Sequence, residues 1–169
     1  MDDIRQHILD QVKTAFWKVR LNGGLTLHQA RACDDYKSDH EIEQAGRHDP
    51  EKHWISIDSE KLSRLADAVF FLDARGFLFY APAYMILGLK QIDTNEGLET
   101  EAAIVGWSKF PDNLGYDASS KDKDMPAIRV TAQQKQAALA YINYIVEYRG
   151  APGYCSEEDL KKARSFLQA

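Results

Sequence analysis

The chain has 169 residues, a hydrophobic content of 44% and a charged content of 28%, with a formal net charge of −5 and a pI of about 5.5. This composition excludes an intrinsically disordered chain, and the length suits one domain with a sizeable core. The negative balance argues against nucleic acid or anionic lipid as a partner, because both are polyanions, and leaves a basic protein partner open.

Three further features of the sequence predict a cytoplasmic protein. Cys33 and Cys155 lie far apart and form no Cys-x-x-Cys pattern, so two reduced thiols are favoured over one disulfide. The N-terminal segment begins with two acids and lacks the apolar stretch of a signal peptide. No apolar run approaches the ~20 residues that a membrane-spanning helix needs, so no membrane partner is expected.

The N-terminal part of the chain has the pattern of consecutive helices. The spacing of apolar side chains predicts a helix over residues 3–20, which ends at a pair of glycines. Thr26 and Gln29 form a capping-box pattern and predict a second helix that continues to about residue 36. Residues 37–48 are polar and have no clear period, which predicts a loop or a weak helix.

The next part combines two helix starts with the most hydrophobic passage of the chain. Asp49, which precedes a proline, and Asp58 each predict the start of a helix. The helix from Asp58 is predicted to end at Gly76, followed by a short irregular joint at residues 77–80. Pro82 then lies in the first turn of another helix. We expect the hydrophobic passage to be core that the other helices cover.

The second half of the chain predicts three more helices. One covers residues 100–109, whereas residues 111–127 have the Pro, Gly, Asn, Asp and Ser content of a surface loop. Thr131 opens the clearest helix of the chain with a second capping box, and Ser156, followed by three acids, caps the last one. Because no alternating polar and apolar run occurs, we predict an all-α fold, a compact single-domain bundle of six or seven helices over residues 1–169.

The sequence contains no motif for nucleophilic catalysis, phosphate binding or dinucleotide binding. His40, His48 and His53 lie among acids, but their spacing differs from that of metal ligands on a helix. A solvated loop is therefore favoured over a metal site. We expect no catalytic residue, no metal and no cofactor.

Two groups of side chains are candidates for binding. Acids that follow the second predicted helix form either a docking surface for a basic partner or a solvated face. Polar and aromatic groups around the hydrophobic passage either line a cleft or belong to the core. The candidate binding residues are Asp34, Asp35, Trp54, Arg75, Tyr80 and Tyr84.

Three tyrosines of the long C-terminal helix fall on one side of it, at Tyr141, Tyr144 and Tyr148. Tyrosines at this spacing either anchor an interface or ligand, or lie in the core with their hydroxyl groups at the surface. The core explanation is favoured.

Three segments of the first half carry a resemblance to a known family: "GGLTLHQARACDDY", "HWISIDSEKL" and "FFLDARGFLFYAPAYMILGL". The matching positions are Gly24, Thr26, Leu27, Ala30, Asp34, Trp54, Phe79, Tyr80, Pro82, Ala83, Tyr84 and Met85. Over residues 24–89 the chain resembles the bacterial family of unknown function DUF6714. The resemblance implies a bacterial, cytosolic protein and brings no established activity or catalytic residue.

These observations lead to two hypotheses. The first is a non-catalytic protein-binding module, such as an immunity or antitoxin-type protein that neutralises a basic toxin. The alternative is a small-ligand-binding protein or an enzyme with a cleft near Tyr80–Tyr84.

Overall fold

The computed structural model describes residues 2–93, 98–119, 127–150, 153 and 155–169, and no strand occurs in these ranges. The α-helices are α1 (Asp3–Phe16), α2 (Leu27–Asp34), α3 (Asp39–Ala45), α4 (Ser59–Arg64), α5 (Ala74–Gln91), α6 (Leu98–Ser119), α7 (Ala132–Arg149) and α8 (Glu157–Gln168). Three short 3-10 segments are η1 (Gly46–His48), η2 (Trp54–Ser56) and η3 (Ala66–Phe71). The predicted all-α class is therefore confirmed.

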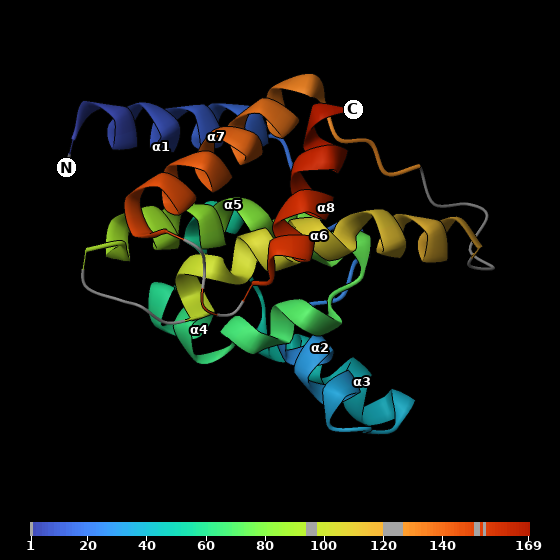
Figure 1. Ribbon diagram of the computed structural model, residues 1–169. Helices are drawn as coiled ribbons and strands as arrows, with labels where there is room; N and C mark the ends of the chain where they lie inside the picture. Colours follow the sequence, from blue (N-terminus) through green and yellow to red (C-terminus); the bar gives the residue numbers. More distant parts are fainter. Residues whose placement is uncertain (1, 94–97, 120–126, 151–152, 154) are drawn as a thin grey trace.

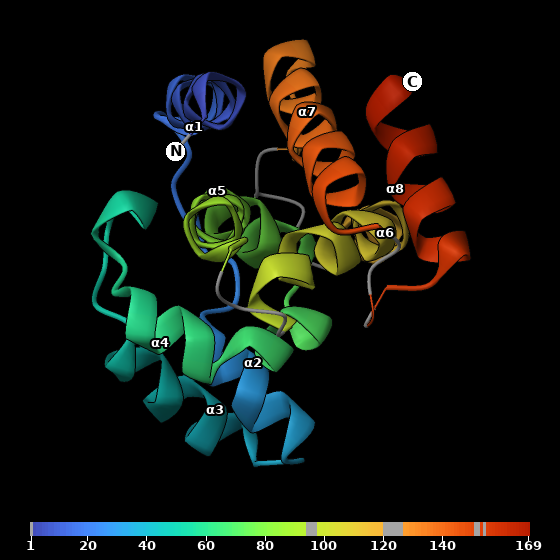
Figure 2. The same cartoon turned by 60° about the vertical axis from the view of Figure 1, so that its left-hand side comes forward.

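The helices pack in three layers, which Figure 1 and Figure 2 show from two sides. α5 and α6 pack against each other in the middle layer, and α8 packs against α6 and α7. α1 and α7 cover one side of this pair, whereas η3, α4, α2 and α3 cover the other. α2 and α3 form a lobe that lies farthest from α1 and α7 (Figure 1). Within the described ranges, no helix is both long enough and apolar enough to cross a membrane.

Side-chain caps explain where most of these helices begin. The capping boxes predicted at Thr26 and Thr131 are both present, and Asp58 and Ser156 cap α4 and α8 as predicted. Each cap satisfies a backbone N–H that would otherwise lack a partner in the first turn. The capping residues seen in the sequence therefore locate these four helix starts correctly.

The helix predicted from Asp58 to Gly76 is wrong, since α4 ends at Arg64 and η3 follows over Ala66–Phe71, and the joint predicted after it is wrong too. Asp73 does not end a helix but begins α5, because its Oδ1 accepts a hydrogen bond from the N–H of Gly76 at 2.7 Å. Gly76 therefore lies in the first turn of α5, and residues 77–80 are helical rather than an irregular joint. Pro82 lies in the interior of this helix. An interior proline costs about 3 kcal/mol or more, so the burial of α5 must outweigh this cost.

Helix occurs in two further segments, one predicted as a loop or a weak helix and the other as a surface loop. In residues 37–48, Ser38 and Glu41 form a capping box that opens α3, a signal that the sequence interpretation overlooked. In residues 111–127, α6 continues to Ser119 and holds Pro111 in its interior. Residues 120–126 lie outside the described ranges. In both segments, the density of polar and turn-forming residues was a weaker guide than capping and packing.

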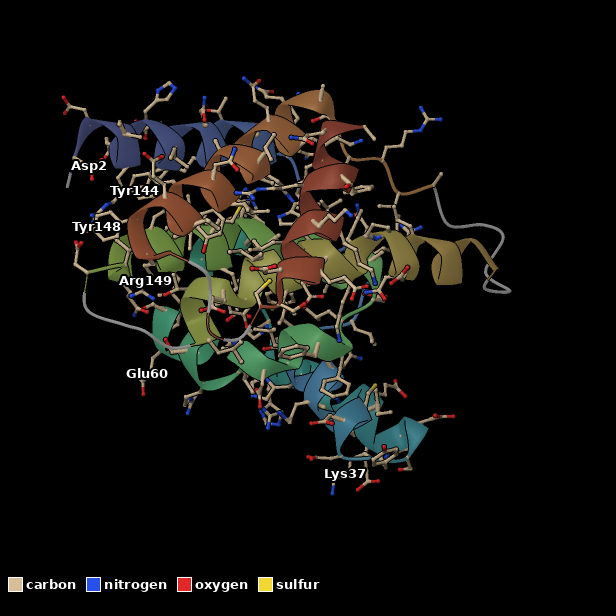
Figure 3. All side chains as sticks on the ribbon, viewed as in Figure 1. Asp2, Lys37, Glu60, Tyr144, Tyr148 and Arg149 are labelled. Carbon is tan, nitrogen blue, oxygen red and sulfur yellow. The ribbon has the colours of Figure 1, made fainter. Side chains whose placement is uncertain are left out.

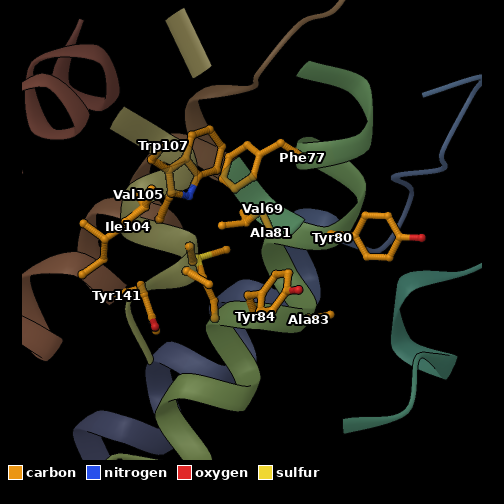
Figure 4. Packing of buried hydrophobic residues seen from close by; sticks show 14 of the residues in the cluster. Val69, Phe77, Tyr80, Ala81, Ala83, Tyr84, Ile104, Val105, Trp107 and Tyr141 are labelled. Atoms are coloured by element: carbon orange, nitrogen blue, oxygen red, sulfur yellow. The ribbon is translucent and has the colours of Figure 1, made fainter. Parts of the chain in front are cut away.

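An aromatic cluster around Trp107 forms the centre of the core (Figure 4). Its ring lies 5.0 Å from that of Phe77, 5.3 Å from that of Phe110 and 6.3 Å from that of Phe166, measured between centroids. Gly106 permits the contact between α5 and α6, since a Cβ at this position would lie 1.9 Å from Cε2 of Phe77. The hydrophobic passage is thus core, as predicted.

The tyrosines of α7 divide between the core and the surface. Tyr141 is fully buried, and its hydroxyl group donates a hydrogen bond to the carbonyl oxygen of Thr100. Tyr144 is half-buried and Tyr148 is exposed. The core explanation therefore holds for the first of the three tyrosines, and the other two contribute to a polar network.

This network joins α1, α7 and the end of α5 around Arg5, which is only 6% exposed. Figure 3 labels three other members of the network, Asp2, Tyr144 and Tyr148. The guanidinium group donates to both carboxylate oxygens of Asp93, at 2.7 and 3.1 Å, and its Nε–H donates to the hydroxyl oxygen of Tyr144 at 3.2 Å. The hydroxyl groups of Tyr144 and Tyr148 donate to Asp2 and Asp93, at 2.7 and 2.6 Å. Hydrogen bonds from Arg5 and Tyr148 lower the pKa of Asp93 to about 2.

Candidate functional site

The turn between α2 and α3 has an unusual residue at its centre. Tyr36 has a φ of 54°, in the left-handed region of backbone conformation. Its N–H donates to the carbonyl oxygen of Cys33 at 3.1 Å, and the N–H of Lys37 donates to that of Ala32 at 3.0 Å. This pair of hydrogen bonds defines a Schellman motif, in which the left-handed position is usually glycine.

The side chain of Tyr36 contributes little to the fold. It is 96% exposed, more than any other large hydrophobic side chain in the described ranges. A residue with a Cβ in the left-handed conformation costs roughly 1–2 kcal/mol. The backbone of Tyr36 is strained and its ring is solvated, so a tyrosine here is unfavourable for stability, which makes Tyr36 a candidate binding residue.

Acidic side chains surround this tyrosine along the chain. Residues 34–43 contain five carboxylates and one lysine, a formal net charge of −4 against −5 for the whole chain. The acids are Asp34, Asp35, Asp39, Glu41 and Glu43. Glu41 accepts hydrogen bonds from Ser38, which lower its pKa, whereas none of the other four pairs with a cation in the part of the chain that the structure describes.

We call residues 34–43 the acidic turn. The acidic turn includes the first five residues of α3, a helix without a buried residue, so it lies on the outside of the molecule. Figure 3 labels Lys37 at the tip of the lobe, at the opposite end of the molecule from Asp2. This position leaves the acidic turn accessible to a large partner.

The buried carboxylate of Asp49 connects the start of α2 with Lys61 of α4. Its Oδ2 accepts the backbone N–H of His28 at 2.9 Å, and its Oδ1 lies 2.9 Å from Nδ1 of His28 and 3.2 Å from Nζ of Lys61. Nζ of Lys61 is also 2.5 Å from Glu51. Burial acts to raise the pKa of Asp49, but hydrogen bonds from His28 and Thr26 outweigh it and lower the pKa.

Asp49 therefore begins no helix, and the prediction from its place before a proline is wrong. Instead, its negative charge lies at the N-terminus of α2, where the helix dipole favours it. The constellation of His28, Asp49, Lys61 and Glu51 was missed by the sequence interpretation, because its members come from three separate segments. Three groups contact the carboxylate of Asp49: the backbone N–H of His28, its Nδ1 atom and Nζ of Lys61. We therefore infer that this constellation holds the start of α2 in place.

The three histidines considered as metal ligands lie in different surroundings. The ring of His48 lies 5.2 Å from that of His28, whereas the ring of His53 lies 4.7 Å from that of Trp17. His40 is exposed on α3. Among the described residues, no group of three or more His, Cys, Asp or Glu side chains is arranged to hold a metal ion.

Three of the six candidate binding residues lie in the core. Trp54, Tyr80 and Tyr84 are each at most 2% exposed. Nε1 of Trp54 donates to the carbonyl oxygen of Phe16 at 2.8 Å, and the hydroxyl group of Tyr84 donates to that of Leu65 at 2.9 Å. Burial raises the pKa of Tyr80. These polar atoms serve to join the middle layer to its neighbours.

The other three candidates lie elsewhere. Asp34 and Asp35 belong to the acidic turn, and Arg75 lines a separate cavity near the start of α5. The structure therefore does not gather the six residues in one cleft, and their role in binding stays a prediction. The sequence interpretation missed Tyr36. The available signal was its position at a helix end, where glycine or asparagine is more usual than an aromatic residue.

Comparison with known proteins gives a single relation. No curated protein and no solved structure matches the chain significantly. The model of a family described as of unknown function matches residues 4–166, which extends the resemblance seen over residues 24–89 to almost the full length. The chain therefore belongs to the family of unknown function DUF6714.

Proposed function

We propose that this protein is a non-catalytic protein-binding module that docks a basic protein through the acidic turn. The observation that carries the proposal is Tyr36, a strained and 96% exposed aromatic side chain within a segment of net charge −4. Tyrosine is enriched among the residues that dominate binding energy at protein interfaces. A surrounding set of carboxylates accelerates association with a positively charged partner and disfavours acidic ones.

The partner class that we favour is a toxin with a basic functional surface. In this hypothesis the protein acts as an immunity or antitoxin-type protein, and Tyr36 inserts into the toxin surface while the acids pair with its lysines and arginines. Support comes from the net charge of −4 in residues 34–43 and from the exposed position of the lobe.

The test is a binding measurement with the product of a neighbouring gene in the native host. Tyr36→Ala should weaken binding about thirtyfold, as expected for a dominant interface residue. Asp34→Asn with Asp35→Asn should slow association and reduce its dependence on salt concentration. As a matched control, Glu157→Gln with Glu158→Gln removes two exposed acids from the start of α8 and should leave binding unchanged.

Two results would contradict the proposal. One is the absence of binding to any co-encoded protein at micromolar concentration. The other is a complex whose affinity is the same for wild type and Tyr36→Ala, because the acidic turn would then lie outside the interface.

A cavity favours the small-ligand alternative as a second candidate. It has a volume of about 140 Å³ and lies between α1, η2, α4 and α5. Trp54, Leu62, Ala83 and Ile86 line it, together with Lys13, Ser59 and Lys90. An apolar cavity of about 150 Å³ is large enough for benzene. Titration with benzyl alcohol, followed by amide chemical shifts, should perturb this cavity, and Ala83→Met should abolish the effect by filling it.

A further inference from the structure

A second cavity lies where the segment after α1, the first turn of α5 and the segment before α7 meet. Its volume is about 300 Å³. Four basic side chains line it, Lys18, Arg20, Arg75 and Arg129, and no acid is found among the described residues that line it. We call these four residues and the cavity between them the basic pocket.

Three of the four basic side chains have no acidic partner among the described residues. Across the described ranges, no carboxylate pairs with Lys18, Arg20 or Arg129. Nη1 of Arg20 donates to the carbonyl oxygens of Trp17 and Val19, at 2.9 and 2.8 Å, which orients the guanidinium group and leaves its charge intact. Like charges that converge in this way repel one another, and a bound anion would relieve the repulsion.

The walls of the basic pocket are held in place by the fold. Oδ1 of Asp73 accepts the N–H of Leu25 at 3.0 Å and that of Gly76 at 2.7 Å, so one carboxylate joins the segment after α1 to the start of α5. Gly24 permits this close approach, because a Cβ there would lie 2.4 Å from the backbone nitrogen of Gly76. Two of the three segments around the cavity are therefore fixed before any ligand binds.

The remaining lining is aliphatic. Val19, Leu21, Leu78 and Ile128 line the cavity and are partly buried against the hydrophobic core. A ligand in this cavity would thus meet an apolar surface and basic side chains together. Guanidinium groups bind carboxylate and phosphate alike with paired hydrogen bonds, but several cations around one cavity favour a doubly charged phosphate over a singly charged carboxylate.

We propose that the basic pocket binds a small organic phosphate, whose apolar part contacts the aliphatic lining and whose phosphate group lies among Lys18, Arg20, Arg75 and Arg129. The cavity volume is at the lower end of the range typical of small-molecule sites, so the ligand has the size of a monocyclic aryl phosphate. The site uses no residue of the acidic turn and is independent of the proposed docking function.

The experiment titrates the full chain with phenyl phosphate, inorganic phosphate and phenol, with amide chemical shifts as the readout. Phenyl phosphate should perturb residues 18–22, 75–78 and 127–134 at millimolar concentration or below. Inorganic phosphate should bind the same residues more weakly, because it lacks the apolar contact, and phenol should leave them unchanged at the same concentrations.

Variants separate a specific site from general attraction of charge. Arg129→Gln should weaken phenyl phosphate binding about two- to fivefold, and Lys18→Gln combined with it should weaken binding about tenfold. Arg129→Lys keeps the charge and should recover part of the affinity. Lys52→Gln removes an exposed lysine outside the cavity and should have no effect.

The proposal fails if phenyl phosphate perturbs no residue of the basic pocket, or if Lys52→Gln weakens binding as much as Arg129→Gln does. Equal binding of phenol and phenyl phosphate would also overturn it, because the cations would then contribute nothing. Retention of the wild-type spectrum outside the pocket shows that each variant is folded.

Discussion

The substitution Tyr36→Gly tests whether Tyr36 lowers the stability of the fold while it contributes to partner binding. Glycine adopts the left-handed conformation at little steric cost and is the usual residue at this position of a Schellman motif. The tyrosine ring is 96% exposed, so its removal takes almost no apolar contact from the core. We therefore expect a more stable protein that binds its partner less well.

The magnitude follows from two opposing effects. Relief of the left-handed strain contributes roughly 1–2 kcal/mol, whereas the greater freedom of glycine in the unfolded chain costs about 0.5–1 kcal/mol. The difference between these two ranges is a rise in the free energy of unfolding of about 0–1.5 kcal/mol, which corresponds to an increase in Tm of roughly 0–6 °C for a chain of this size.

Urea unfolding, with fluorescence and circular dichroism as probes, measures this change in the free energy of unfolding. The companion variant Tyr36→Ala removes the ring but keeps the Cβ, so its stability should stay within about 0.5 kcal/mol of wild type. Both variants should lose affinity for a basic partner. A destabilised Tyr36→Gly protein would refute the reasoning, because it would mean that the ring contributes to the fold.

Three further substitutions test the packing and the polar networks. Gly106→Ala should destabilise the protein by about 1–3 kcal/mol in urea unfolding, because the added Cβ would lie 1.9 Å from Cε2 of Phe77 and overpack the core. Unchanged stability would disprove this close contact. Asp93 has its pKa lowered to about 2 by Arg5, so its ionised form stabilises the fold fully above pH ~4, and this contribution is lost as the pH falls through about 2. Asp93→Asn should therefore flatten the loss of stability over that acid range, and an unaltered pH profile would count against the ion pair. Lys61→Met removes the ammonium group shared by two carboxylates and should cost about 1–3 kcal/mol, measured by thermal unfolding; Lys61→Arg, which keeps the charge, serves as its control.

Local signals in the sequence predict the fold class and many of the helix starts. Capping patterns such as those at Thr26 and Thr131 act over three residues, so they can be read without knowledge of the tertiary structure. The course of α5 and α6 could not be read in this way. Pro82 and Pro111 usually mark helix boundaries, but here they lie inside helices whose burial outweighs the local cost.

The candidate sites were harder to predict than the helices. The acids of residues 34–43 were visible as a charge cluster, but the strain and exposure of Tyr36 depend on the backbone of the folded turn. The basic pocket combines side chains from residues 18–22, Arg75 and residues 127–134, which only the packing of three segments brings together. Arg75 was identified from sequence, although as part of a different cleft.

The pairing of α1 with α7 has a consequence for how the chain folds during synthesis. Arg5 and Tyr144, which are in contact in the native protein, lie 139 residues apart. At roughly 5–20 residues per second, the ribosome needs about 7–30 s to produce the second after the first. α1 can meet α5 earlier, but its other packing partner, α7, is synthesised later than α5. The apolar side chains that α1 buries against α7 therefore stay uncovered in the nascent chain until α7 has been made.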